Sequence, residues 1–429
     1  MTLKIYFYKK QCYNVVQEGK VMTKVDLSGY AKKFEDDVTS FNDYEATDYV
    51  RSLKNEGLLD EAIEVGSTFR SMCPNLKGYI NQYGYALYNK HINIPVNKIS
   101  ENEFLFFSFA NDILGMCKQE KYSPYEVTVN RMIKYITSQN PINYDKYLET
   151  LKLLDPKLLS DQPLLIKERN QEGESPLERW YRQMVKVHYD MKNYKDCITY
   201  ANNALAMIHN FHYRNLQWIK YYRACSQVAL GNYEEGQRDF LALQGQIRDI
   251  NFYEVLYTTY SSLNDDKKAN TFLLYDLYQS GYDVSKIGLF ENLLKACQKA
   301  EYTALADLVS LFLKKMEKEA GKISEIENDP YANEDSGIIY DRMMEELTAH
   351  LDKLVERVQG KVIYYNKEKQ FGNIKTPQDD TIFFRQADYI YDEEVQKYDV
   401  VEYTVIPAYD RKKDEQTSRA VLLTLEYSD

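Results

Sequence analysis

The chain has 429 residues, of which 44% are hydrophobic and 28% are charged, and it carries six cysteines and a net charge of −11. This length leaves room for two or three domains with buried cores, and the composition excludes wholesale disorder, collagen-like repetition and a disulfide-stapled miniprotein. The acidic balance also excludes a chain coated in phosphate-binding surface, so any nucleic-acid site must be local.

The amino-terminal segment, residues 1–10, lacks the apolar core of a signal peptide. No run of about 18 uncharged apolar residues, the length of a membrane-spanning helix, occurs in the chain. The cysteines are far apart and form no CxxC pair. We therefore expect a cytoplasmic protein that is neither secreted nor membrane-spanning.

From about Asp43 to Met316 the sequence predicts helix after helix, joined by short polar turns. Five segments repeat the same order of features. A turn is followed, in most cases, by an aromatic or aliphatic residue, and then by a small or modest residue where the second helix of a hairpin meets the first. These marker residues are Ala62, Cys197, Gly236, Ala269 and Leu305. The last four lie 39 (197 to 236), 33 (236 to 269) and 36 (269 to 305) residues apart.

These separations bracket 34 residues, and the pattern resembles tetratricopeptide repeats. The resemblance implies an α-solenoid of stacked helix pairs, whose groove binds an unidentified protein or peptide. The fourth unit departs from the pattern, because Asp266 stands at the aromatic position. An unrelated helical bundle is the alternative, since alternating helices of similar length also produce some self-similarity.

Composition shifts divide the chain into four parts. A predicted loop over residues 160–175 separates an N-terminal helical lobe, residues 1–159, from a C-terminal helical lobe, residues 176–320. Residues 321–357 follow as an acidic tether with one more helix, predicted from Ile338 to Val358. Residues 358–429 contain short β-prone runs between polar turns, which predict a five-stranded barrel of the oligonucleotide-binding type.

The opening of this last part resembles the cold-shock domain, whose strands read G-x-V-K-W-F-N, K-G-F-G-F-I and D-[IV]-F-V-H. Here the corresponding segments are Gly360–Asn366 (GKVIYYN), Lys369–Ile374 (KQFGNI) and Thr381–Arg385 (TIFFR). The resemblance covers about 70 residues and implies a site for single-stranded RNA or DNA. It assigns base stacking to Tyr364, Phe371 and Phe383, and a backbone contact to Lys369.

The chemistry of these residues fits that role. Flat aromatic faces stack on unpaired bases for about 1–3 kcal/mol each, largely without regard to sequence. Four lysines stand against the single acid Glu368 between residues 361 and 375: Lys361, Lys367, Lys369 and Lys375. Arg385 stands at the histidine position and can both stack and bind phosphate. Asn373 and Gln386 replace two family aromatics, which predicts micromolar or weaker, salt-dependent binding.

No HExxH, GxSxG, Walker-type or GxGxxG motif occurs, so we expect neither an enzyme nor a bound metal or cofactor. The predicted function is that of a non-catalytic adaptor, with protein on its helical repeats and single-stranded nucleic acid on its barrel. The architecture is similar to accessory proteins of bacterial conflict and defence systems. The alternative is a protein-only scaffold, in which Phe371 and Phe383 belong to the core or to a protein interface. A helical regulator of transcription is less supported, because no basic recognition helix is evident.

Overall fold

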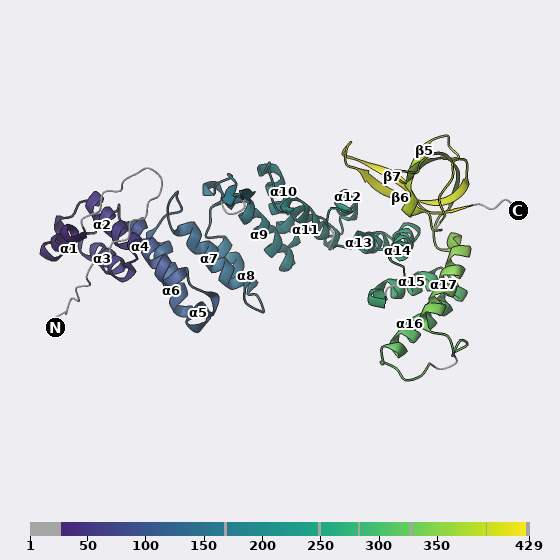
Figure 1. Ribbon diagram of the computed structural model, residues 1–429, viewed down its shortest axis with the longest axis horizontal. Coiled ribbons are helices and arrows are strands. Elements are labelled where there is room, and N and C mark those ends of the chain that lie inside the picture. The colour runs from purple at the N-terminus through teal and green to yellow at the C-terminus, as the bar shows by residue number, and fades with distance from the viewer. Residues whose placement is uncertain are drawn as a thin grey trace. The chain divides into compact units, whose positions relative to one another are not determined.

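The computed structural model describes residues 27–166, 170–247, 250–281, 284–326, 329–391 and 393–425. The amino-terminal segment that lacks a signal-peptide core and the last four residues of the barrel region lie outside these ranges. As the sequence predicts, the molecule is mainly helical and has a five-stranded sheet near its C-terminus (Figure 1). Within the ranges given, no helix is both long and apolar enough to cross a membrane.

The chain divides into two compact units between Leu159 and Ser160. The described part of the first unit contains α1 (Leu27–Asp36), α2 (Asp43–Asn55), α3 (Leu59–Met72), α4 (Ile80–Leu87), α5 (Val96–Glu101), α6 (Glu103–Met116), α7 (Tyr125–Thr137) and α8 (Tyr144–Leu151). Asn42 starts α2 through a capping box with Glu45. The rings of Phe41 and Phe69 pack in its core, with centroids 5.0 Å apart.

The second unit continues with nine more helices in its described part. They are α9 (Pro176–Asp190), α10 (Tyr194–Met207), α11 (Asn215–Ala229), α12 (Tyr233–Leu243), α13 (Phe252–Ser262), α14 (Asp266–Ser280), α15 (Ile287–Lys299), α16 (Thr303–Glu319) and α17 (Ser336–Ala349). Helices that follow one another along the chain pack side by side. Ser175 caps α9, where Pro176 occupies the first turn.

One kind of turn joins the two helices of five hairpins. The second residue after the first helix has a positive φ in each: Gly57 (80°), Lys192 (60°), Gly231 (84°), Asn264 (57°) and Glu301 (53°). A left-handed residue at this position ends a helix and reverses the chain. The five marker residues on the second helices are buried. The added Cβ atom of any residue larger than Gly236 would lie 3.0 Å from the Ala224 carbonyl oxygen, so glycine permits close helix contact there.

Two predicted elements differ from the structure. The predicted loop over residues 160–175 contains a short hairpin of β1 (Leu164–Ile166) and β2 (Gln171–Gly173). The helix predicted to end at Val358 stops at Ala349. Beyond it the chain turns, while Leu351, Leu354 and Val355 remain buried in the helical core. The apolar residues continue at helical spacing beyond the end of the helix because the following turn buries these side chains as well. This spacing explains why the sequence predicts a longer helix.

The acidic segment after α16 is held against that helix by a buried ion pair. Lys315 Nζ lies 2.7 Å from Asp329 Oδ2, and both side chains are about 6% exposed. The same ammonium donates hydrogen bonds of 2.6 Å to the carbonyl oxygens of Tyr331 and Glu334. The hydrogen bond from Lys315 lowers the pKa of Asp329. These contacts fix the path of the chain from α16 to α17.

The C-terminal strands are β3 (Val358–Asn366), β4 (Phe371–Lys375), β5 (Thr381–Arg385), β6 (Val400–Asp410) and β7 (Glu415–Leu425). They close into a barrel in the order β3-β4-β5-β7-β6, in which β5 and β7 are parallel and the other neighbouring pairs are antiparallel. Alternate residues face inward, as period-two strands require. The barrel core includes Val362, Ile374, Phe384 and Tyr403, all at most 1% exposed.

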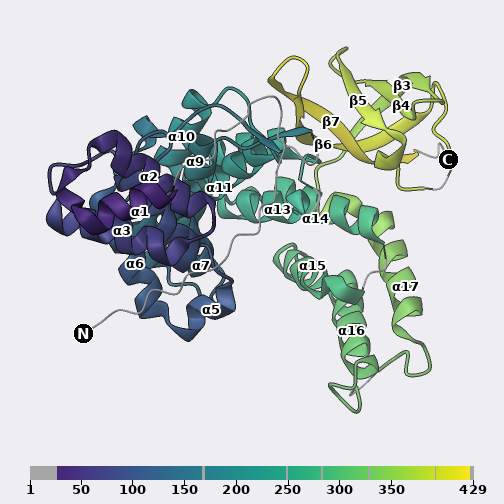
Figure 2. The same cartoon turned by 60° about the vertical axis from the view of Figure 1, so that its left-hand side comes forward.

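The barrel packs directly on the helices of the second unit. Ile406 of β6 and Val421 and Leu422 of β7 belong to the helical core rather than to the barrel core. Figure 2 shows β6 and β7 as the strands that lie toward α13 and α14. The Arg357 side chain, 7% exposed, donates hydrogen bonds to the carbonyl oxygens of Glu402 (2.9 Å) and Leu422 (2.5 Å). Because residues 419–424 of β7 are buried on both faces, binding experiments require the full chain.

Candidate nucleic-acid interface

The predicted stacking residues lie on the outer face of β3, β4 and β5. Residues opposite one another in neighbouring strands share a face. The register gives two rows across this face: Tyr364, Asn373 and Phe383, and then Asn366, Phe371 and Arg385. Gly372 faces inward, where an added Cβ would lie 2.4 Å from the Tyr364 carbonyl oxygen and 2.5 Å from the Phe384 ring. This glycine lets β3 and β4 close over the core beneath the rings.

The three rings are neighbours. The ring centroids of Tyr364 and Phe371 are 6.1 Å apart, and those of Phe371 and Phe383 are 5.6 Å apart. Tyr364 is 44% exposed, Phe383 is 38% exposed, and Phe371 between them is half-buried. We call Tyr364, Phe371 and Phe383 the aromatic strip. The alternative that Phe371 and Phe383 belong to the barrel core does not hold. Both rings lie on the outer face, and the residues that follow them, Gly372 and Phe384, face the core instead.

The lysines around the aromatic strip are not equivalent. Lys367 forms an ion pair of 2.6 Å with Glu394, and Lys375 forms one of 2.5 Å with Asp379. Lys369 is exposed in the turn between β3 and β4, where its backbone N–H donates to Asn366 Oδ1 at 2.9 Å. Among the described residues, neither the exposed Lys369 nor the exposed Arg385 forms an ion pair, although the charge of Arg385 acts on the nearby buried carboxylate of Asp388. The cationic groups available to a ligand therefore number fewer than the sequence indicates.

A buried network anchors the end of β5. The Arg385 backbone N–H donates to Asp388 Oδ2 at 2.7 Å, and the Tyr275 hydroxyl of α14 donates to Asp388 Oδ1 at 2.6 Å. Arg419 Nε of β7 lies 3.6 Å from Asp388 Oδ2, and its guanidinium lies over the Tyr275 ring. Burial raises the pKa of Asp388 and that of Tyr275. The strand that carries Phe383 and Arg385 is thus fixed to the helices.

Sequence reasoning missed this anchoring network. Its members come from three distant segments, and Tyr275 and Asp388 are 113 residues apart along the chain. Asp388 lies in the short turn Gln386–Asp388, where an acidic residue is common in any protein. No pattern in one sequence could have paired it with a tyrosine of a helix.

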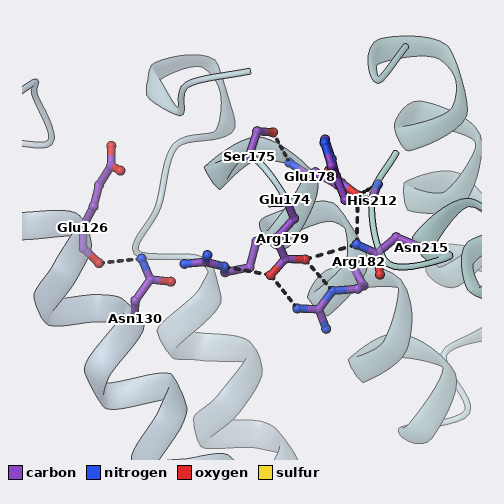
Figure 3. Close-up of polar contacts among 9 residues, drawn as sticks. All are labelled: Glu126, Asn130, Glu174, Ser175, Glu178, Arg179, Arg182, His212 and Asn215. Atoms are coloured by element: carbon purple, nitrogen blue, oxygen red, sulfur yellow. Dashed lines mark hydrogen bonds and ion pairs between the residues drawn. The ribbon is translucent and has the colours of Figure 1, made fainter. Parts of the chain in front are cut away.

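A second polar site lies among α9, α11 and the turn before α11 (Figure 3). Glu174 accepts hydrogen bonds from Arg179 (2.9 Å) and from two nitrogens of Arg182 (both 3.0 Å). The Asn215 amide donates to Glu174 at 3.1 Å and to the fully buried Glu178 at 2.8 Å. Glu178 also accepts the backbone N–H of His212 at 2.7 Å. The buried side chains of Glu178 and Asn215 thereby obtain hydrogen-bond partners.

This network borders a pocket of about 390 Å³. Its lining is polar and aromatic and consists of Glu174, Arg182, Lys186, Tyr213, Asn215, Trp218 and Tyr222. The rings of Trp218 and Tyr222 are stacked, with centroids 5.9 Å apart. Rigid aromatic side chains next to fixed charges are typical of peptide and protein contacts. The pocket is therefore the candidate protein-binding site on the helices.

We expect Glu174→Gln to lower the free energy of unfolding by about 1–3 kcal/mol at pH 7, because two arginines lose a charged acceptor. Burial opposes ionisation of Glu174, but the hydrogen bonds and charges of Arg182 and Arg179 outweigh it and lower its pKa. A lowered pKa in the folded state favours folding above the ordinary value of about 4.3, and this contribution is lost as the pH falls through the folded-state pKa. Urea unfolding at pH 7 and pH 3.5 should therefore show a difference between wild type and variant that shrinks in acid.

The control for this prediction is Glu172→Gln. The Glu172 side chain is 65% exposed and lies 4.0 Å from His212, so its loss should change stability little at either pH. A difference between wild type and Glu174→Gln that is the same at both pH values would contradict the assigned role of the ionised carboxylate.

Comparisons with known proteins supply no family. No protein-family model matches the chain, and a search of curated proteins finds no match. Among the described residues, no group of three or more histidine, cysteine, aspartate or glutamate side chains is placed to hold a metal ion.

Proposed function

We propose that this chain is a non-catalytic adaptor that binds single-stranded RNA or DNA on the aromatic strip and a protein or peptide on its helices. The observation that carries the proposal is the aromatic strip itself. Its rings are adjacent, partly exposed and fixed on a rigid sheet, and burial of such rings against unpaired bases is favourable. Rings left at a surface without a partner expose apolar area that a monomeric protein ordinarily avoids.

The barrel supports the same proposal. Five strands in the order β3-β4-β5-β7-β6 agree with an oligonucleotide-binding barrel, in which the face around the second and third strands binds the ligand. The cold-shock resemblance assigns its stacking role to the three residues that lie together here. Lys369 and Arg385 lie at one end of this face and would bind phosphates.

The helices support the adaptor role. Five hairpins share one turn geometry, and the buried marker residues of the last four recur at separations of 39, 33 and 36 residues, which favours stacked repeats of the tetratricopeptide type. Stacked helix pairs present an extended surface for a protein or peptide, and the pocket beside Trp218 and Tyr222 lies on these helices.

A protein-only scaffold is the second candidate. The ion pairs of Lys367 with Glu394 and of Lys375 with Asp379 favour it, because they reduce the positive charge beside the aromatic strip. An exposed aromatic surface with little net charge would suit a protein partner. Whether the chain binds a single strand in a salt-dependent way separates the two candidates.

Binding of a labelled single strand should weaken as salt rises. Each phosphate neutralised by a lysine or arginine contributes about −0.7 to the slope of log K against log salt concentration. The double variant Lys369→Ala/Arg385→Ala should therefore make this slope shallower by about 1.4. The slope is measured by fluorescence anisotropy of the full chain with single-stranded RNA and DNA between about 50 and 200 mM salt.

The matched control is Lys412→Ala/Lys413→Ala, which removes two exposed lysines from the turn between β6 and β7. Its slope should equal that of the wild type. A slope unchanged in Lys369→Ala/Arg385→Ala would show that these two residues do not bind the phosphates, whereas no salt-sensitive binding of either single strand would favour the protein-only scaffold.

A further inference from the structure

An additional exposed tyrosine lies beside β3. The Tyr398 backbone N–H donates to the Val362 carbonyl oxygen at 2.8 Å, and the Val362 N–H donates to the Asp399 carbonyl oxygen at 2.9 Å. These bonds hold the turn before β6 against the middle of β3. The Tyr398 side chain is 62% exposed. The backbone that carries this exposed ring is therefore held at the barrel surface.

Two lysines flank the Tyr398 ring. Lys361 Nζ lies 5.4 Å from the ring centroid, and Lys397 Nζ lies 4.7 Å from it. In the part of the chain that the structure describes, neither ammonium forms an ion pair with a carboxylate. The carboxylate of nearby Asp399 accepts the backbone N–H of Gln396 at 2.7 Å. An exposed ring between two such cations suits a ligand that carries both a flat apolar face and negative charge.

Lys361 connects this tyrosine to the aromatic strip. In the sheet register Lys361 is opposite Lys375 of β4, and Tyr364 is opposite Asn373 of β4. Asn373 and Lys375 are two residues apart on that strand. Since residues two apart on a strand share a face, Lys361 and Tyr364 both lie on the outer face despite the bulge between them. On its other side Lys361 pairs with Val400, which is 39% exposed and follows Tyr398 by two residues. The outer face thus continues from the strip to Tyr398.

We propose that Tyr398 stacks on one further base of the bound single strand, while Lys361 and Lys397 bind the phosphates beside that base. This inference rests on the proposed function and extends the aromatic strip to a fourth stacking position. A single-stranded nucleic acid fits because its bases and phosphates alternate, as the rings and lysines do along this face. A protein partner would need acidic and aromatic groups in the same alternation.

The Tyr398 backbone permits a clean test. Its φ is 81°, a conformation in which glycine is favoured over any residue with a side chain. Tyr398→Gly therefore removes the ring and should leave the unfolding midpoint unchanged or raised. Because stacking on one ring is lost, affinity for a labelled single strand of about 12 nucleotides should fall about fivefold or more. Tyr398→Phe keeps the ring and should bind within about twofold of the wild type.

The matched control is Tyr122→Gly. Tyr122 is 76% exposed, has a φ of 65° and lies under Lys121 Nζ at 4.9 Å, but it belongs to the first unit rather than to the barrel. Its substitution should leave affinity unchanged. Lys361→Ala/Lys397→Ala should make the salt slope shallower by about 1.4, as expected for two lost phosphate contacts.

The outcomes separate the two proposals. Loss of affinity in Tyr398→Gly but not in Tyr122→Gly supports the fourth position. If the wild type binds and the aromatic strip is required, but Tyr398→Gly binds as the wild type does, the fourth position is wrong and the proposed function stands. If the wild-type chain binds no single strand, both proposals fail.

Discussion

Replacement of Tyr364, Phe371 and Phe383 together by alanine should weaken binding of single-stranded RNA and DNA at least about a hundredfold. Each ring contributes about 1–3 kcal/mol of stacking, so the loss of three amounts to at least about 3 kcal/mol. The fold should persist, because the rings lie outside the barrel core formed by residues such as Phe384. Fluorescence anisotropy of the full chain at low salt measures the change in Kd.

The control for this variant removes an equal number of exposed rings elsewhere. Tyr44, Phe104 and Tyr122 are 74%, 85% and 76% exposed in the first unit. The triple substitution Tyr44→Ala/Phe104→Ala/Tyr122→Ala should bind within about twofold of the wild type. These rings lie on helices or their turns, and no contact with nucleic acid is predicted for them. If the aromatic-strip variant binds as tightly as the wild type, the nucleic acid is bound at another surface.

Asp388→Ala should lower the free energy of unfolding by about 3–5 kcal/mol, the largest stability effect that we expect in the barrel. The Asp388 side chain is fully buried, and Arg419 beside it is 6% exposed. Removal of the carboxylate leaves the buried guanidinium without its counter-charge and the Tyr275 hydroxyl without its acceptor. Chemical denaturation of the full chain measures the loss, and hydrogen exchange should increase in both α14 and β7.

Two variants bracket this effect. Tyr275→Phe removes one hydrogen bond but no charge and should cost about 1–3 kcal/mol. Glu394→Ala breaks the exposed pair with Lys367 and should cost less than about 1 kcal/mol. A loss in Asp388→Ala no larger than that in Glu394→Ala would show that the network does not hold the barrel to the helices.

Much of the barrel face could be predicted from sequence because its information is local. Alternation along β5 places Phe383 outside and Phe384 inside, and the structure agrees. Two short hairpin connections then bring β3, β4 and β5 side by side, so that rings separated along the sequence become neighbours in space. The same local logic located the helical hairpins, since their turns recur with left-handed residues.

The remaining features depend on contacts that no local pattern records. Lys367 is paired with Glu394, which comes from beyond β5, so the charge of the segment from Lys361 to Lys375 overstated the cationic groups available. The helix after the acidic segment ended early because Leu351 and Leu354 could be buried equally well by a turn. Docking of β7 on the helices required two buried faces on one strand, which alternation alone does not predict.

The most direct test of the account is a titration of the full chain against labelled single-stranded RNA, single-stranded DNA and a duplex of the same sequence. We predict saturable, salt-sensitive binding of at least one single strand in the micromolar range, with the duplex bound more weakly because its bases are already stacked. No salt-sensitive binding of either single strand up to high micromolar protein would contradict the central claim.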